Sequence, residues 1–435
     1  MNVDYLKKSI EINEIVQKKD QKKKLIKDKT LNIVKNFMID KQLICYGGTA
    51  INDLLPKEEQ FYNYDVDIPD YDFFSPNAIE DAKELCDIFS KENVYSVESK
   101  SAFVYGTYKV YVNYVAIADI TQIDKKFYEE LLKTAKQKEK VLYVSPNFLK
   151  MSLHQELARP LGSIDRWEKI YSRLTTFNNI YPVTILSKHK MKHYYINDHK
   201  IDTNDVKTEE IYNNLFKYFK TNKFVFCNFD IVIRNFYKYI KFKPRKKDKY
   251  KDIFIIYTEH LDKTIKELKE KYDVKIDKIN TIYKFVDNYA NIYYNDVLIG
   301  ILFKTNSCLS YNTIKYEKQQ INIGNIDTIL NLYFTLILID NPINNEIVLE
   351  LIHKLQYLLT NYGDIISKYD NFDKLPEPLK RFNLPCYGEQ DSRQDILKKR
   401  NEKYKKYKNN KTSKKYKQWF FKYSPKIKKK TRKIK

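Results

Sequence analysis

Residues 43–74 constrain the fold of this chain more than any other stretch. They read LICYGGTAINDLLPKEEQFYNYDVDIPDYDFF. The apolar run 43–45 predicts a buried strand, Gly47 and Gly48 predict a turn, and residues 49–55 carry apolar side chains at helical spacing before a proline. A glycine turn between a strand and a helix N-terminus presents backbone N–H groups where the helix dipole favours an anion.

The second half of this stretch adds two acidic residues. Asp70 and Asp72 are two positions apart, so both carboxylates are expected on one face of a strand. Ser75 is expected to cap the helix that follows over residues 77–91. Two carboxylates beside a phosphate-binding turn are what two divalent metal ions and a nucleoside triphosphate require. The alternative interpretation is a polar strand edge.

A third acid lies in the run KVYVNYVAIADIT, residues 109–121, which is rich in Val, Tyr and Ile as a buried strand should be. Asp119 is its only acid. An isolated carboxylate inside an apolar strand is costly unless it is paired or bound to a metal. Asp119 is therefore the candidate third ligand, and the alternative is a strand-end residue that faces water.

GGTAI followed by IPDYDFFSP resembles the nucleotidyltransferase core of the DNA polymerase β superfamily. More narrowly, it resembles the catalytic poly(A) polymerases of large nucleocytoplasmic DNA viruses, of the mimivirus and poxvirus type. The resemblance implies template-independent addition of AMP from ATP to mRNA 3′ ends. It also implies two Mg²⁺ (or Mn²⁺) ions held by Asp70, Asp72 and Asp119.

In this resemblance Gly47, Gly48 and Thr49 would hold the β- and γ-phosphates of the triphosphate. The segment between Gly48 and Asp70 is longer than in most of the superfamily. Asp65 and Asp67 would fit the usual spacing better. The pair Asp70 and Asp72 is nevertheless preferred, because only this pair is continued by an apolar strand and a capped helix.

Residues 144–177 contain ELARP and RWEKIYSRL, which resemble the ELSRP…RWEKVYKRL signature of the viral polymerases, with Ala158 in place of a serine. Asp165 is expected to cap a helix whose polar surface carries Arg166 and Lys169. These two cations either contact the triphosphate or the RNA backbone, or merely solvate the helix.

When the chain is aligned with itself at a constant offset and without gaps, an internal repeat becomes visible. The shift that places Cys45 on Cys227 also places Asp70 on Asp252, and both fall within further strand–helix patterns. The other chemical residues are replaced, as Gly47, Gly48, Asp72 and Asp119 become, in order, Phe229, Asp230, Phe254 and Ile301. This pattern predicts a degenerate, catalytically empty duplicate, and the alternative is coincidence among α/β units.

The C-terminal 38 residues hold 19 Lys or Arg and one acid, which is +18 of the total formal charge of +23. Lysines that bind phosphate and aromatic rings that stack on bases suit single-stranded nucleic acid. The predicted RNA contacts are Lys405, Lys406, Lys414, Lys415 and Trp419. The alternative is a solubilising or targeting tail, and the segment is expected to be mobile in isolation.

These observations predict an α/β (α+β) chain of three parts. They are a polymerase β-like nucleotidyltransferase domain with N-terminal helices (1–182), a degenerate nucleotidyltransferase-like domain (183–395) and a basic, aromatic-rich tail (396–435). No apolar run approaches the roughly 20 residues of a membrane span, and no signal peptide is expected. The five cysteines form no CxxC pair, so neither zinc nor a disulfide framework is expected.

The resemblance implies a viral enzyme in the host cytoplasm (the viral factory), with the virion as a second location. It also implies either a homodimer or a cap-modifying partner subunit. Three rival functions stay open. They are a terminal nucleotidyltransferase of different base choice, an inactive RNA-binding or processivity subunit with this fold, and a small-molecule nucleotidyltransferase.

Overall fold

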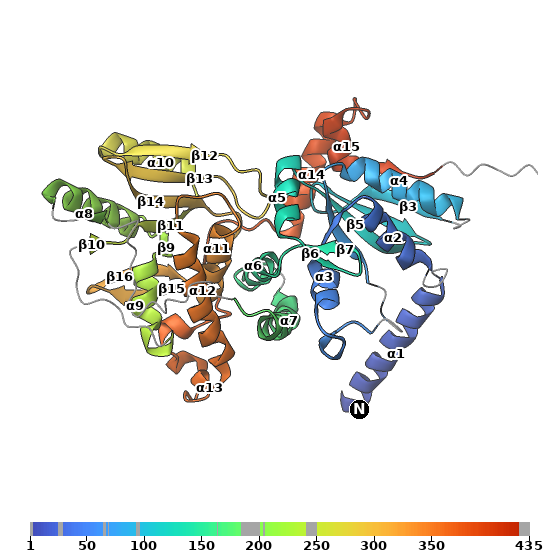
Figure 1. Cartoon of the computed structure of the whole chain (residues 1–435), viewed down its shortest axis with the longest axis horizontal. Helices are drawn as coiled ribbons and strands as arrows, with labels where there is room; N and C mark the ends of the chain where they lie inside the picture. Colours follow the sequence, from blue (N-terminus) through green and yellow to red (C-terminus); the bar gives the residue numbers. More distant parts are fainter. Residues whose placement is uncertain are drawn as a thin grey trace, which may run out of the picture. The chain divides into compact units, whose positions relative to one another are not determined.

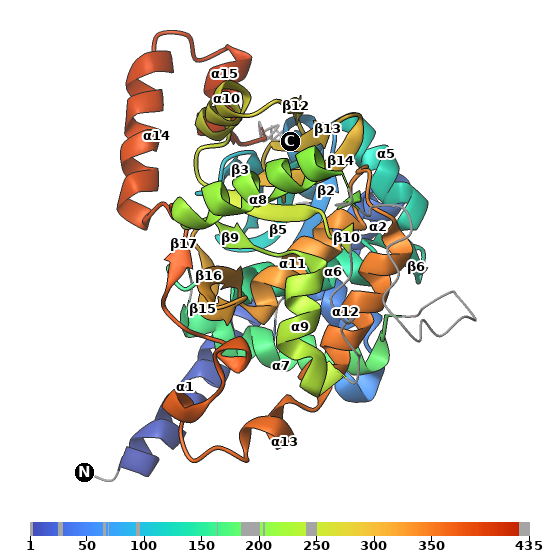
Figure 2. The same cartoon turned by 90° about the vertical axis from the view of Figure 1, so that its left-hand side faces the viewer.

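The computed structural model describes residues 3–24, 29–63, 67, 69–92, 96–162, 164–183, 201–202, 205–240 and 250–425. The chain divides into two compact units, residues 1–145 with 393–435 and residues 146–392. Each unit contains an eight-stranded mixed sheet with helices packed against it (Figures 1 and 2). No helix in the described ranges combines the length and the apolar character that crossing a bilayer requires.

The sheet of the first unit has the strand order β18-β3-β4-β5-β2-β1-β7-β6. Its strands are β1 (Ile44–Tyr46), β2 (Tyr71–Ser75), β3 (Val97–Ser101), β4 (Thr107–Val112), β5 (Val115–Gln122), β6 (Lys136–Lys138), β7 (Val141–Tyr143) and β18 (Lys422–Tyr423). Its helices are α1 (Val3–Lys24), α2 (Lys29–Asp40), α3 (Gly47–Leu54), α4 (Ala78–Lys91), α5 (Lys125–Thr134), α14 (Arg393–Tyr407) and α15 (Lys414–Phe420). The strand and the helix predicted in residues 43–55 are therefore confirmed, but the two glycines of the predicted turn are the first residues of α3.

Helix α4 covers β3, β4 and β5 with an apolar face, as its helical periodicity predicts. The cap of this helix differs from the prediction. The N-cap is Asn77, and the hydroxyl of Ser75 instead accepts a hydrogen bond from the Asn77 N–H and donates to Asp81. Ser75 still ends β2, so it couples the strand to the helix that follows.

The sheet of the second unit has the order β12-β13-β14-β11-β9-β16-β15-β17, beside a two-stranded sheet of β8 and β10. Its strands are β8 (Ile201–Asp202), β9 (Val225–Phe226), β10 (Tyr250–Lys251), β11 (Phe254–Thr258), β12 (Lys275–Ile279), β13 (Tyr289–Tyr294), β14 (Val297–Lys304), β15 (Leu309–Tyr316), β16 (Gln319–Gly324) and β17 (Cys386–Tyr387). Its helices are α6 (Pro146–Leu157), α7 (Trp167–Ile180), α8 (Val206–Thr221), α9 (Phe229–Ile240), α10 (Leu261–Lys271), α11 (Ile326–Leu336), α12 (Asn345–Thr360) and α13 (Tyr362–Ile366).

The two sheets repeat one another strand by strand. Reading from β3 to β6 in the first sheet and from β12 to β15 in the second gives the same path through the chain. The hairpins β4–β5 and β13–β14 are related by the shift that places Cys45 on Cys227, at both ends of both strands. Their register shifts, after Val110 and after Ile292, are related by the same shift. The predicted duplication is therefore confirmed in the fold.

The contacts divide the chain at other places than the predicted boundaries of 182/183 and 395/396. Helix α6 packs on α11 and α7, so both α6 and α7 lie in the second unit. The tail does not form a separate part, because β18 pairs antiparallel with β3 and extends the sheet of the first unit. Helices α14 and α15 form a hairpin, visible at the upper left of Figure 2. The tail is therefore ordered in the whole chain as far as residue 425, and its expected mobility in isolation stays a prediction.

The expectation of no disulfide is wrong. Cys308 and Cys386 are bonded, with Cα atoms 5.2 Å apart and a sequence separation of 78. The bond adjoins the antiparallel pairing of β15 with β17, in which Ser310 lies opposite Cys386. Strand pairing across a long sequence separation brings these cysteines together, so no local spacing motif announced them.

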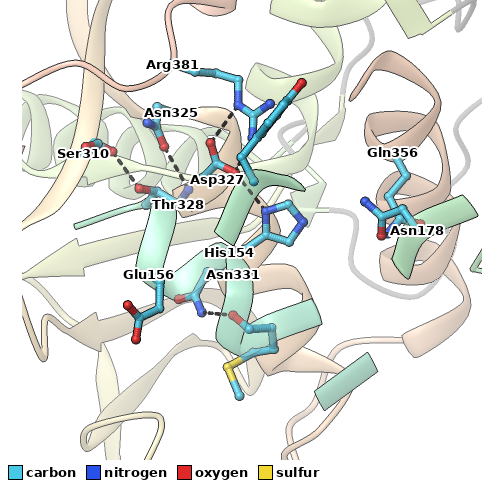
Figure 3. Close-up of polar contacts among 12 residues, drawn as sticks. His154, Glu156, Asn178, Ser310, Asn325, Asp327, Thr328, Asn331, Gln356 and Arg381 are labelled. Carbon is cyan, nitrogen blue, oxygen red and sulfur yellow. Dashed lines mark hydrogen bonds and ion pairs between the residues drawn. The ribbon is translucent and has the colours of Figure 1, made fainter. Parts of the chain in front are cut away.

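A fully buried ionic cluster lies in the core of the second unit (Figure 3). The carboxylate of Asp327 on α11 accepts two hydrogen bonds from Arg381, at 2.8 and 2.7 Å, and lies 2.9 Å from Nδ1 of His154 on α6. The three side chains are at most 1% exposed. Burial alone would raise the pKa of Asp327, but Arg381 and His154 lower it well below its usual range. This cluster joins α6, α11 and the segment that carries Arg381.

Candidate active site

The turn between β1 and α3 brings a helix N-terminus against a carboxylate. Gly47 has a φ of +75°, and a Cβ atom built on it would lie 2.4 Å from Oδ2 of Asp72. Only glycine fits here, because a side chain would strain the backbone and collide with the carboxylate. Tyr46 precedes α3 without capping it through its side chain. The first N–H groups of the helix, at Gly47 and Gly48, therefore favour an anion.

Thr49 ties the glycine turn to the start of β2. It is 1% exposed, and its hydroxyl donates a hydrogen bond to the backbone carbonyl of Asp70 at 2.7 Å. The sequence predicted that this hydroxyl binds phosphate, whereas the structure engages it in holding Asp70. The backbone N–H of Thr49 still belongs to the first turn of α3.

Two of the three predicted acidic residues lie on neighbouring strands, and Asp70 directly precedes one of these strands. Asp72 lies opposite Asp119 in the parallel pairing of β2 with β5. Paired residues project from the same face of a sheet, so both carboxylates share one face. Asp70 precedes Asp72 by two positions and lies close enough for its charge to act on the Asp119 carboxyl. The sequence therefore selected residues that lie together.

Lys109 was not predicted and completes this row of side chains. It lies opposite Asp119 in the pairing of β4 with β5, and its Nζ is 2.5 Å from Oδ2 of Asp119. Burial raises the pKa of the Asp119 carboxyl, the charge of Asp70 adds to this, and Lys109 opposes it. Burial alone would lower the pKa of Lys109, but the hydrogen bond and charge of Asp119 raise it. The other oxygen, Oδ1 of Asp119, is buried without a hydrogen-bond partner.

This donor set fits a hard divalent cation. Such cations prefer carboxylate oxygens, and a buried carboxylate oxygen that lacks a partner is an atom that a cation would satisfy. Within the described ranges, however, no three His, Cys, Asp or Glu side chains converge closely enough to ligate one ion. A cation in direct contact with Asp119 is supplied instead by Lys109.

Tyr46 is a second residue that the sequence did not single out. It lies opposite Asp72 in the pairing of β1 with β2, its ring stacks on Phe74 at 4.0 Å, and its hydroxyl is 2.8 Å from Oγ1 of Thr121. Burial and the charge of Asp72 raise the pKa of this phenol well above its usual value. Tyr46 therefore stays a neutral phenol that packs beside the carboxylates. Only the pairing of the strands reveals its position, since no motif marks it.

The alternative acidic pair, Asp65 and Asp67, comes before the strand that follows Asp70 in the chain. Asp65 lies outside the described residues. Asp67 belongs to a loop, where its carboxylate accepts a hydrogen bond from the Asn63 N–H at 2.9 Å. Asp70 and Asp72, by contrast, are continued by β2, as expected.

The basic residues of the ELARP–RWEKIYSRL segment lie in the second unit. Arg166 ends a short 3₁₀ helix and lies 3.4 Å from a carboxylate oxygen of Glu156, and Lys169 is exposed on α7. Asp165 does not cap α7, because the helix starts at Trp167 with Arg166 as its N-cap. A phosphate-binding role for Arg166 and Lys169 stays a prediction.

The corresponding positions of the duplicate show how the site is lost. Asp252, which aligns with Asp70, accepts hydrogen bonds from the backbone N–H groups of Asp230 and Ile253, at 2.9 and 3.0 Å. Asp230 lies in the first turn of α9, so the protein's own carboxylate occupies this helix N-terminus. Phe254 replaces the second carboxylate and packs against Gly300. The duplicate is therefore filled by its own side chains.

The tail presents its lysines on a structured surface. Trp419 packs on Tyr105 with ring centroids 4.5 Å apart, and the nearly buried Phe421 packs edge-on against Tyr108 at 5.5 Å. Trp419 is thus partly covered, whereas the predicted RNA-binding lysines are exposed: Lys405, Lys406, Lys414 and Lys415. A pocket of about 410 Å³ lies between α15 and the start of α4, and Lys414 and Lys417 line it.

Comparison with known proteins bears on the segment that contains this site. Residues 32–163 match the family described as Poly(A) polymerase catalytic subunit. The predicted resemblance to the viral poly(A) polymerases is confirmed. Over 163 residues the chain is 29% identical to a candidate poly(A) polymerase catalytic subunit of Acanthamoeba polyphaga mimivirus, and over 162 residues 27% identical to one of African swine fever virus, isolate Tick/Malawi/Lil 20-1/1983. Each match covers 36% of this chain.

These matches span only 27% and 34% of the length of the two relatives. A solved structure, that of the Megavirus polyadenylate synthase, is similar over 98% of this chain and 86% of its own, with a TM-score of 0.74 and 20% identity. That likeness extends across both units and shows the polymerase β-like nucleotidyltransferase fold. The viral poly(A) polymerase resemblance in sequence is therefore concentrated on the segment that holds Gly47, Asp70, Asp72 and Asp119.

Proposed function

We propose that this chain is a template-independent polynucleotide adenylyltransferase that adds AMP from ATP to the 3′ end of mRNA. One observation carries the proposal. Asp72 and Asp119 lie opposite one another on parallel strands, with Asp70 beside them, next to a helix N-terminus whose N-cap residue, Tyr46, does not cap it through its side chain. Carboxylates and an anion-binding turn are the two parts that nucleotidyl transfer needs in one place.

In this proposal the N–H groups of Gly47, Gly48 and Thr49 bind the triphosphate of ATP. Asp70, Asp72 and Asp119 would hold two Mg²⁺ or Mn²⁺ ions, which lower the pKa of the attacking 3′-hydroxyl and neutralise charge on the leaving pyrophosphate. Thr49 ties the backbone of Asp70 to the start of α3, and Tyr46 lies opposite Asp72 on the neighbouring strand. The covalent chemistry needs no cysteine or histidine, since the α-phosphorus is attacked by the RNA hydroxyl itself.

The test is extension of an RNA oligonucleotide by the full chain with Mg²⁺ and each nucleoside triphosphate separately. The wild-type protein should incorporate AMP, and Asp72→Asn and Asp119→Asn should reduce the rate by at least about 1,000-fold, an electrostatic loss of the size expected when a charge-stabilising group is removed. Asp67→Asn is the matched control, because it removes an acid of the competing pair, and it should extend RNA normally. Wild-type rate in Asp72→Asn, or loss of activity in Asp67→Asn, would refute the site.

The same experiment separates the rival functions. Preferred incorporation of UMP or CMP would favour a terminal transferase of another base choice. Binding of RNA without metal-dependent incorporation would favour an inactive RNA-binding or processivity subunit. In the second copy the Asp252 carboxylate fills the start of α9, whereas the first copy keeps Gly47 beside Asp72. This difference favours an active first copy over an inactive subunit.

The tail hairpin is proposed as an RNA-binding surface. Its lysines follow α14 and α15, and no carboxylate within the described ranges forms an ion pair with Lys414 or Lys417 beside the pocket of about 410 Å³. Unpaired lysines at such a surface suit the phosphates of a single strand. The double variant Lys414→Ala with Lys417→Ala should weaken RNA binding. The slope of log affinity against log salt concentration should become smaller by about two, because two phosphate contacts are lost. Unchanged salt dependence would contradict this surface.

The wider biology is proposed from the viral relatives. We expect the protein in the host cytoplasm, at the viral factory, and in the virion. We also expect either a homodimer or a complex with a cap-modifying subunit. Mass measurement of the purified protein, alone and from infected cells, distinguishes these assemblies.

A further inference from the structure

Lys109 contacts the acidic row directly. It faces Asp119 across β4 and β5, Asp119 faces Asp72 across β5 and β2, and the four-strand row ends at Tyr46. The lysine side chain is 30% exposed, and that of Asp119 is 13% exposed. The ion pair is thus partly withdrawn from water, where a charge interaction is stronger than on the surface.

The charge balance of this row explains why a cation is needed. Asp70, Asp72 and Asp119 lie at neighbouring positions, and the charge of Asp70 acts on the Asp119 carboxyl, so like charges repel within this group. Lys109 is a cation that contacts Asp119 of this group, and the charge of Asp70 also acts on it. A resident positive charge therefore holds Asp119 in the row.

We propose that Lys109 is a positioning residue that acts as an internal counter-ion for Asp119 and competes with the catalytic metal for it. This inference rests on the proposed function, because it takes Asp119 as a metal ligand. The lysine Nζ holds Oδ2 of Asp119, and a divalent cation would bind the partnerless Oδ1 of the same carboxylate. The two positive charges would then repel one another across a single carboxylate, so Lys109 opposes metal binding while it neutralises the carboxylate in the absence of metal.

The test measures metal affinity rather than activity. Binding of Mn²⁺ to the full chain is measured by calorimetry for wild type, Lys109→Met and Lys109→Arg. Lys109→Met should bind Mn²⁺ about tenfold more tightly, because it removes a competing unit charge a few ångströms away. Lys109→Arg keeps the charge and should stay within about twofold of wild type.

Lys100 supplies a matched control. It lies on β3 directly opposite Lys109, but it pairs with Glu98 rather than with the acidic row. Lys100→Met should leave Mn²⁺ affinity unchanged. In an Asp119→Asn background, Lys109→Met should no longer tighten binding, because the shared carboxylate is gone.

Thermal melting gives a second readout. Lys109→Met should melt below wild type in chelator and gain more from added Mn²⁺ than wild type does, since a ligand stabilises the folded state according to its affinity. Equal or weaker Mn²⁺ affinity in Lys109→Met, or equal tightening in Lys100→Met, overturns the inference. If wild type extends RNA while Lys109→Met binds Mn²⁺ no more tightly, only this inference fails. If neither protein binds Mn²⁺ or extends RNA, the proposed function fails as well.

Discussion

Replacing Arg381 with methionine tests whether the buried cluster of Figure 3 holds the second unit together. Arg381 makes two hydrogen bonds to Asp327, and both side chains are at most 1% exposed. Its guanidinium also lies 4.8 Å from the ring centre of Phe382 and 5.2 Å from that of Tyr362. Methionine retains much of the volume but leaves the Asp327 charge unpaired in the core.

The expected loss follows from that unpaired charge. Removal of one partner of a buried ion pair costs about 3–5 kcal/mol. Lys380→Met is the neighbouring control, because the pair of Lys380 with Glu377 is open to solvent at its carboxylate, which is 48% exposed, and should cost below about 1 kcal/mol. The double variant Asp327→Asn with Arg381→Met should lose less than the sum of the single losses, since no buried charge remains.

Urea unfolding measures these losses in one unit at a time. The chain has two tryptophans, Trp167 in the second unit and Trp419 in the first. A Trp419→Phe background leaves Trp167 as the fluorescence reporter. Its ring lies 5.5 Å from that of Phe382, beside the cluster. A loss below about 1 kcal/mol in Arg381→Met, no larger than in Lys380→Met, would refute the reasoning.

Three further predictions concern other sites. Gly47→Ala should slow RNA extension by about 100-fold through displacement of the carboxylate beside it, whereas Gly363→Ala, which has open space around it, should not. Burial lowers the pKa of His154, so the unfolded chain takes up a proton that the folded chain does not. As the pH decreases below about 6.5, the free energy of unfolding should therefore fall more steeply in wild type than in His154→Gln. The difference should be up to about 1.4 kcal/mol per pH unit, measured by urea titration at each pH. Phe421→Ala should destabilise the first unit by about 3–5 kcal/mol, and Phe420→Ala by much less, in melts followed by Trp419 fluorescence.

The two copies of the fold differ at the N-terminus of the helix that follows the first strand. In the first copy the N-terminus of α3 faces Asp72 across a glycine turn. In the second copy Asp252 satisfies the start of α9, and Tyr316 donates a hydrogen bond to Asp230 at 3.0 Å. A duplicate filled by its own side chains is suited to a scaffold, and the proposed chemistry lies in the first copy alone.

The disulfide and the docked tail show a common source of error in the sequence-based predictions. Cys308 bonds to Cys386, and Trp419 packs on Tyr105, although both pairs are far apart along the chain. Local composition indicates a loop or a charged tail at these places. Pairing of β17 and β18 with distant strands decides what they become.

The sequence alone determined the strand–helix order and the duplication, because each depends on periodicity or on spacing along the chain. It predicted that Asp70, Asp72 and Asp119 act together. Only the tertiary structure placed these acids in one row with other side chains across β4, β5, β2 and β1. Lys109 and Tyr46 enter the site through the registers of β4 with β5 and of β1 with β2, and His154 meets Asp327 from a distant part of the chain. Such contacts depend on which strands and helices pack together, and that choice is made by the folded chain as a whole.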